Sequence, residues 1–158
     1  MNGNTLAQIN GGGAEVEVTP LVTAGAYTAG FQVGPVMTFP NVFPATCNGI
    51  LESITIKFAA SLQTTEFDLA IFSAQPSGTF GDHAAPAIAT ADSALLIGIY
   101  ALTSAQSQLG THTIYNLDAI GKQICSQSTN LYGVLISRAA SAALASTADV
   151  SVRIGTVW

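Results

Sequence analysis

Short segments of alternating apolar and polar residues, separated by glycine and proline, recur along this 158-residue chain. Such alternation is typical of half-buried β-strands. The clearest strand is expected at 50–58, where Ile50 and Phe58 should share one face and Leu51 the other. Further extended segments are expected at 15–19, 21–23, 31–39, 66–74, 97–102, 111–117, 131–138 and 150–157, and residues 120–125 are expected to form a strand or a single helical turn.

One short helix is expected after Thr90, a suitable N-cap residue with an acidic side chain in the following turn. No segment is long enough to supply the helix that usually connects parallel strands. At this length a single domain is expected. The sequence therefore predicts an all-β fold, a jelly-roll-like antiparallel β-sandwich of about eight strands with one short helix and an extended N-terminal arm.

The flexible N-terminal arm is expected to span residues 1–14, and the β-sandwich domain to span 15–158. The arm is polar and ends in three glycines, which favour neither helix nor strand. It could be a frayed terminus, or it could become ordered on a neighbouring subunit. In the second case its apolar residues Leu6 and Ile9 would lie in the interface.

The chain is very poor in charge, and this excludes several classes of function. Charged residues make up 8% of it, against roughly 25% in an ordinary soluble domain. Four lysines and arginines are too few for a nucleic-acid binder, and they disfavour binding to an anionic membrane surface. Because charged residues are depleted in the cores of protein interfaces, we expect partners to cover much of the surface.

The sequence also predicts where in the cell the protein is found. No apolar run approaches the roughly 20 residues of a membrane-spanning helix, and residues 1–10 do not resemble a secretory signal. We therefore expect a protein that stays in the cytoplasm of the cell that makes it. Cys47 and Cys125 are expected to be separate buried thiols there, with one disulfide conceivable after release from the cell.

Residues able to carry catalysis are scarce. His83 follows Asp82 in the long connection 75–90, and this pair is expected to be a solvated loop pair rather than a metal site. Glu66 and Asp68 should share one strand face, as paired carboxylates of a glycosidase would, although a solvated face is the commoner reason. No nucleophile elbow or phosphate-binding loop occurs. We therefore expect no catalytic residue, no cofactor and no metal, and hence no enzyme.

Several segments together resemble a family of small virion proteins of tailed bacteriophages. The resemblance covers roughly residues 18–155 and rests on short motifs: AYTAG at 26–30, FDLAIFSAQP at 67–76, Gly81-Asp82, ADSALLIG at 91–98 and LYGVLI at 131–136. It implies a head decoration, or cement, protein of jelly-roll-like fold that dimerises or trimerises. It implies no catalytic residues, and at the matched positions Pro76 would end a strand, Asp82 would brace the long loop and Asp92 would lie in the first turn of the helix.

The sequence therefore predicts a non-enzymatic decoration protein on the outer surface of the phage head. Its expected partners are the major capsid protein and further copies of itself, as a homotrimer or dimer, with no nucleic acid and no membrane. Candidate interface residues are Leu6, Ile9, Phe80, His83 and Trp158, and Phe80 is included because an apolar side chain at a loop tip favours a partner. The alternatives are a tail or fibre-associated β-sandwich module that binds a host surface glycan, and a hydrolase.

Overall fold

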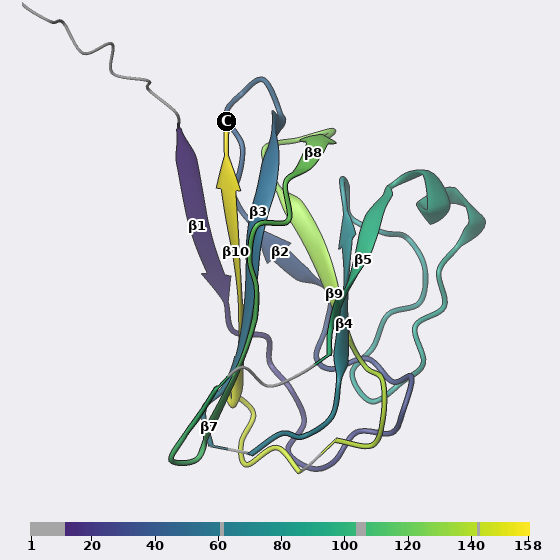
Figure 1. Cartoon of the computed structure of the whole chain (residues 1–158). Helices are drawn as coiled ribbons and strands as arrows, with labels where there is room; N and C mark the ends of the chain where they lie inside the picture. Colours follow the sequence, from purple (N-terminus) through teal and green to yellow (C-terminus); the bar gives the residue numbers. More distant parts are fainter. Residues whose placement is uncertain (1–11, 61, 104–106, 142) are drawn as a thin grey trace, which may run out of the picture.

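The computed structural model describes residues 12–60, 62–103, 107–141 and 143–158, and Figure 1 shows two layers of strands. Every strand pairing in this part of the chain is antiparallel, which confirms the expected all-β sandwich. The elements are β1 (Gly13–Val18), β2 (Met37–Phe39), β3 (Asn48–Phe58), β4 (Phe67–Phe72), the 3-10 helix η1 (Thr90–Ala94), β5 (Leu96–Leu102), β6 (Ser107–Leu109), β7 (His112–Leu117), β8 (Lys122–Cys125), β9 (Leu131–Ser137) and β10 (Val150–Val157).

The strands form two sheets. The first has the order β1-β10-β3-β7-β6, with β8 paired to the other end of the long β3. The second has the order β2-β9-β4-β5. In Figure 1 the first sheet lies on the left and the second on the right, and the connection between β4 and β5 curves over the far right-hand side. The first described residues lie beside the C-terminus because β1 pairs with β10 along its whole length.

The main hydrophobic core fills the space between the sheets. The rings of Phe58, Phe67 and Tyr115 pack together within it, with ring centroids 4.9 to 5.9 Å apart. Strand β4 is largely buried on both faces. Phe67 belongs to the main core, whereas Phe72 lies on the opposite face in a second cluster with Ala70 and Val134.

A β-bulge in β3 reverses the expected face of its first residues. Ser53 pairs with Gly155 but Leu51 pairs with Thr156, so Glu52 is an extra residue on β3. An extra residue shifts the alternation by one. Leu51 is therefore fully buried in the core, and Ile50 is 37% exposed, which is the opposite of the expectation.

Several element boundaries also differ from the expectation. Strand β1 begins at Gly13, so the end of the expected arm belongs to the sheet, while Leu6 and Ile9 lie outside the described residues. Strand β4 ends at Phe72, well before Pro76, so Pro76 is not the residue that ends it. Thr90 is the first residue of η1, and Ala89 occupies the N-cap position.

Candidate functional site

One carboxylate joins two long connections of the fold. Asp82, between β4 and β5, accepts hydrogen bonds from the Thr23 amide, the Tyr27 hydroxyl and the Gly34 amide, each at 2.7 Å. The three donors belong to the connection between β1 and β2. We call these four residues the Asp82 clasp. The position expected to brace the long loop therefore does so, and it ties that loop to a segment far away in the sequence.

Electrostatics in the clasp favour an ionised Asp82. Burial raises the pKa of this carboxyl, but the hydrogen bonds from Thr23, Tyr27 and Gly34 outweigh it and hold the pKa below its ordinary value. Tyr27 responds in the opposite direction, because burial and the negative charge of Asp82 raise the pKa of its hydroxyl well above the usual range. The clasp is thus built from a charged acceptor and a neutral phenol.

His83 is part of this cluster rather than the solvated loop residue that was expected. Its ring packs against the Tyr27 ring with centroids 3.8 Å apart. Its Nε2 lies 3.2 Å from the Ala26 carbonyl oxygen, and its Nδ1 lies 3.6 Å from Asp82 Oδ2. The side chain remains 35% exposed, so one edge of the ring can still reach a partner. Sequence reasoning missed Tyr27 as the link, because it treated the tyrosines as core or interface residues in general.

A second buried carboxylate shapes the same connection. Asp92 is 1% exposed and lies in the first turn of η1, as the matched position implies. It accepts hydrogen bonds from the Ser77 amide (2.7 Å) and hydroxyl (2.9 Å), the Gly78 amide (2.8 Å) and the Ala89 amide (3.1 Å). The Ser77 amide does most to lower the pKa of Asp92. Asp82 and Asp92 thus hold the backbone of the connection between β4 and β5 in place through hydrogen bonds.

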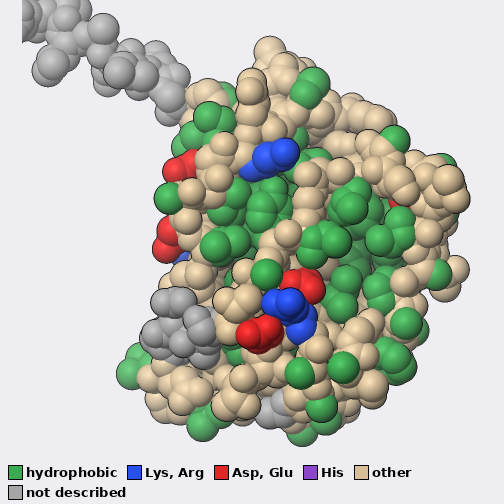
Figure 2. All heavy atoms as spheres, turned by 45° about the vertical axis from the view of Figure 1, so that its right-hand side comes forward, with side chains coloured by type: hydrophobic (Ala, Val, Ile, Leu, Met, Phe, Trp, Pro, Cys, Tyr) green, Lys and Arg blue, Asp and Glu red, His purple; other side chains and the backbone are tan. Residues whose placement is uncertain are grey.

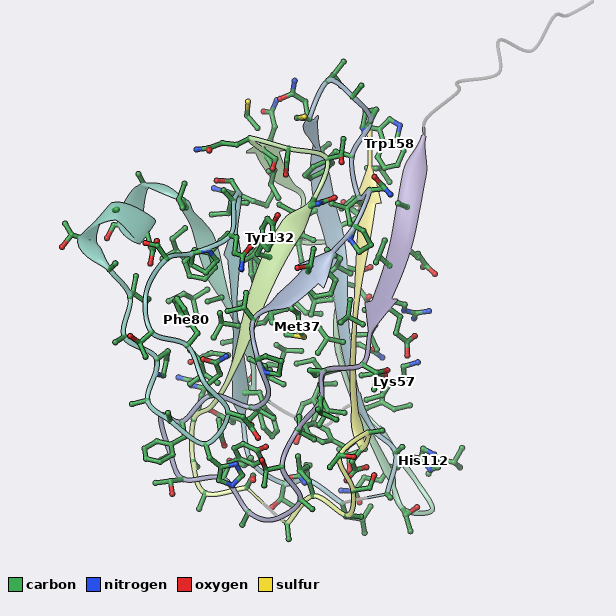
Figure 3. The ribbon with its side chains drawn as sticks, turned by 180° about the vertical axis from the view of Figure 1, so that it is seen from behind. Met37, Lys57, Phe80, His112, Tyr132 and Trp158 are labelled. Carbon is green, nitrogen blue, oxygen red and sulfur yellow. The ribbon has the colours of Figure 1, made fainter. Side chains whose placement is uncertain are left out.

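Phe80 lies in this connection, and it is not the free loop tip that was expected. Its ring packs edge to face on Phe72, with centroids 6.2 Å apart. It covers the outer cluster of the second sheet together with Leu95 and Leu96, which are also partly buried. Packing against the chain's own second sheet therefore shields much of the Phe80 ring from water. Figure 3 shows Phe80 within the loops beside this sheet.

An arginine pairs with both carboxylates at the start of β4, Glu66 just before the strand and Asp68 within it. Arg138 Nη1 lies 2.9 Å from Glu66 Oε2, and Arg138 Nε lies 3.4 Å from Asp68 Oδ2. All three side chains are partly exposed. The arrangement is an ion cluster on the surface beside a shallow hollow of about 440 Å³, and the hollow is otherwise lined by Thr64, Thr65, Ala139 and Ala140.

Ion pairs also protect the edge of the first sheet. Lys57 Nζ lies 2.8 Å from Glu17 Oε1, and Arg153 Nη1 lies 3.4 Å from Glu15 Oε2. Hydrogen bonding to Lys57 lowers the pKa of Glu17. Three of the four basic residues of the chain are therefore paired with acids on its own surface.

Large apolar side chains remain exposed at several places. Ile99 of β5 is 56% exposed, and it pairs with Ala70, so it faces the same side as the outer cluster. Trp158 is 38% exposed; its amide donates to the Gly12 carbonyl at 2.8 Å, and it lies beside the start of β1 (Figure 3). His112 projects outward at the opposite end of the sandwich. The other exposed large apolar residues are Leu21, Ile50, Leu62, Ile88, Leu109 and Val157.

The two cysteines are neither buried nor far apart in space. Cys47 is half-buried and Cys125 is exposed, and both are free thiols. Cys125 pairs with Asn48 in the β3–β8 ladder, and the Ser126 amide donates to the Cys47 carbonyl at 2.8 Å. The two thiols are separate, as expected, but the expectation that both are buried is wrong, because Cys47 is only half-buried and Cys125 is exposed.

Within the described ranges, no group of three or more His, Cys, Asp or Glu residues is placed to hold a metal ion. The described part of the chain also contains no helix with the length and apolar character needed to cross a membrane. Comparison with models of known protein families gives no match, and comparison with curated proteins finds no similar sequence.

Proposed function

We propose that this chain is a decoration protein that binds the assembled lattice of a major capsid protein on the head of a tailed bacteriophage. The sequence resemblance suggests this class of protein. The observation that carries the proposal is the pairing of charges within the chain. Lys57, Arg138 and Arg153 are each paired with acidic side chains of the chain itself, and Asp82 and Asp92 are used in bracing loops.

Such a surface suits a protein that is covered by neighbours. Charges that are already paired lose less when a partner excludes water from them. The exposed apolar side chains, Ile99 and Trp158 among them, supply contact area. A protein that binds only the assembled shell stabilises the shell by mass action, and repetition over the lattice multiplies many weak contacts. This function uses binding alone.

The test is cosedimentation of the full chain, labelled at Cys125, with heads assembled from the major capsid protein of the same genome. We expect saturable binding at a fixed ratio to capsid protein, and at least tenfold weaker binding to the unassembled capsid protein. Heads should also resist thermal opening better when decorated. Equal binding to unassembled protein, or no binding to heads, would overturn the proposal.

A glycan array probed with the same labelled protein tests the alternative of a tail or fibre module. Binding to a host surface glycan, together with no binding to heads, would identify the chain as such a module instead. The absence of glycan binding alongside saturable head binding supports decoration.

A further inference from the structure

Strand β5 forms an open edge of the second sheet. It pairs with β4 on one side, and among the described residues no backbone hydrogen bond runs from Leu96–Leu102 to any other segment. Its sequence, LIGIYAL, contains no charged residue and no proline. The outward N–H and C=O groups of such an edge are a template for another extended strand.

The other edges of the described sheets are protected. Strand β1 carries Glu15 and Glu17, both in ion pairs. Strands β2 and β6 are only three residues long, and β8 is four residues long and begins with Lys122. Short length and charge are the usual devices that prevent edge pairing. Strand β5 has neither device; Ile97 is an extra residue at a bulge near its start, and residues 98–102 beyond it pair regularly with β4.

The chemistry of the β5 edge selects its occupant. Its open hydrogen-bonding groups require an extended segment, and its lack of charge gives a charged strand no ionic partner. The chain itself contains a strand that meets both requirements, which is β5. We propose that β5 pairs antiparallel with β5 of a second copy about a two-fold axis, so that two four-stranded sheets join into one continuous sheet.

Ile99 is the residue that this pairing would cover. It is the middle residue of β5, so antiparallel pairing about the strand centre places it opposite its own copy. It is 56% exposed in the single chain, on the face that carries the outer cluster around Phe72. Figure 2, which brings the right-hand side of Figure 1 forward, shows hydrophobic side chains spread over much of this side of the molecule. Pairing would therefore bury apolar area as well as satisfy the backbone.

The test is the native mass of the full chain by analytical ultracentrifugation across a dilution series. We expect a dimer for the native chain. Ile99→Lys and Ile99→Glu should each raise the dissociation constant at least tenfold, because like charges then face each other across the axis. An equimolar mixture of the two variants should restore the dimer, since opposite charges then meet. Leu21→Lys is the matched control, because Leu21 is 73% exposed but lies between β1 and β2.

Each outcome decides the proposal. A native chain that stays monomeric at every concentration would overturn it, and so would an oligomer that persists in both Ile99 variants. A mixture that fails to reassociate, although both variants retain the native circular dichroism spectrum, would exclude pairing about this axis. Hydrogen exchange gives a second readout, because β5 amides should gain protection with rising concentration. No capsid protein is present, so the result is independent of the proposed function.

Discussion

At the scale of single residues, the two aspartates of the long connection act as fixed acceptors for the backbone. Asp82 gathers donors from another connection, whereas Asp92 gathers donors from its own. Hydrogen bonds to a charged acceptor are roughly twice as strong as neutral ones. A loop of this length with little regular structure is therefore held in one conformation by two side chains.

Replacement of Asp82 should loosen the clasp. In Asp82→Asn the new amide nitrogen faces N–H or O–H donors at one of the two oxygen positions, so at least one hydrogen bond is lost. We expect the free energy of unfolding to fall by about 1–3 kcal/mol in urea titrations. Asp118→Asn is the control, because Asp118 is exposed, and it should change stability by less than about 0.5 kcal/mol. An equal effect of both variants would contradict the role of the clasp.

The same residue should contribute to acid sensitivity. The pKa of Asp82 is lowered in the folded state, so its contribution to stability is fully present above its ordinary pKa of about 4. That contribution is lost as the pH falls through the lower, folded-state pKa. The stability of the native chain should therefore decline more steeply below about pH 4 than that of Asp82→Asn. Parallel curves of unfolding free energy against pH would show that Asp82 has no such role.

At the scale of elements, the sequence predicted where most strands lie but not every face. In β4 the alternation correctly placed Phe67 and Phe72 on opposite faces, but the acidic face was expected to be solvated, and Ala70 and Phe72 on it are buried. In β3 the alternation failed at Glu52, because a bulge depends on the partner strand and not on the pattern of one strand. Strand β6 was missed because three residues carry no detectable period.

The candidate site was predictable only in part, because some of its contacts depend on how distant segments pack together. The matched positions pointed to Asp82 and Asp92, since an acid in a turn-rich segment commonly accepts backbone hydrogen bonds. The packing of Phe80 on Phe72 could not be predicted, because it depends on how the connection folds back over the sheet. Arg138, just after β9, lies beside Glu66 and Asp68 at the start of β4 only because β9 pairs with β4.

The connection between β4 and β5 offers a matched pair of glycine substitutions. A Cβ atom at Gly78 would overlap the Ala87 carbonyl oxygen and come within 2.9 Å of the Ala89 amide nitrogen, and neither backbone group can move cheaply. We expect Gly78→Ala to destabilise the protein by about 1–3 kcal/mol. Gly81→Ala meets no atom within 4 Å and should be neutral or slightly stabilising. Thermal unfolding of both variants measures the difference, and equal melting temperatures would contradict it.

At the scale of the whole molecule, a buried hydrogen bond links the first sheet to the segment that leads into the second. The Tyr115 hydroxyl of β7 donates to the carbonyl of Thr65, just before β4, at 2.7 Å. Burial raises the pKa of Tyr115 to about 12. The phenol therefore joins the two layers only while it keeps its proton.

This linkage predicts the behaviour of the fold in alkali. Because the folded-state pKa of Tyr115 is raised, its contribution is fully present below the unfolded value of about 10 and is lost as the pH rises towards 12. Tyr115→Phe should cost about 0.5–1.5 kcal/mol at pH 7 and should show a shallower decline above pH 10. Denaturant titrations from pH 7 to 11.5 measure both effects. Tyr132→Phe, at a partly exposed position, is the comparison, and an identical alkaline decline in both variants would exclude the link.

The pairing of β1 with β10 has a mechanical consequence. Gly13 opposes Val157 at one end of this ladder and Val18 opposes Val152 at the other, so Gly12 and Trp158 are neighbours. A pull that separates these two residues acts along the hydrogen bonds, which run perpendicular to antiparallel strands. The bonds would then break one after another, as in a zipper, at low force. A load directed along the strands would instead have to shear the whole β1–β10 ladder at once, so the sandwich should resist stretching along its strands far better than separation of these ends.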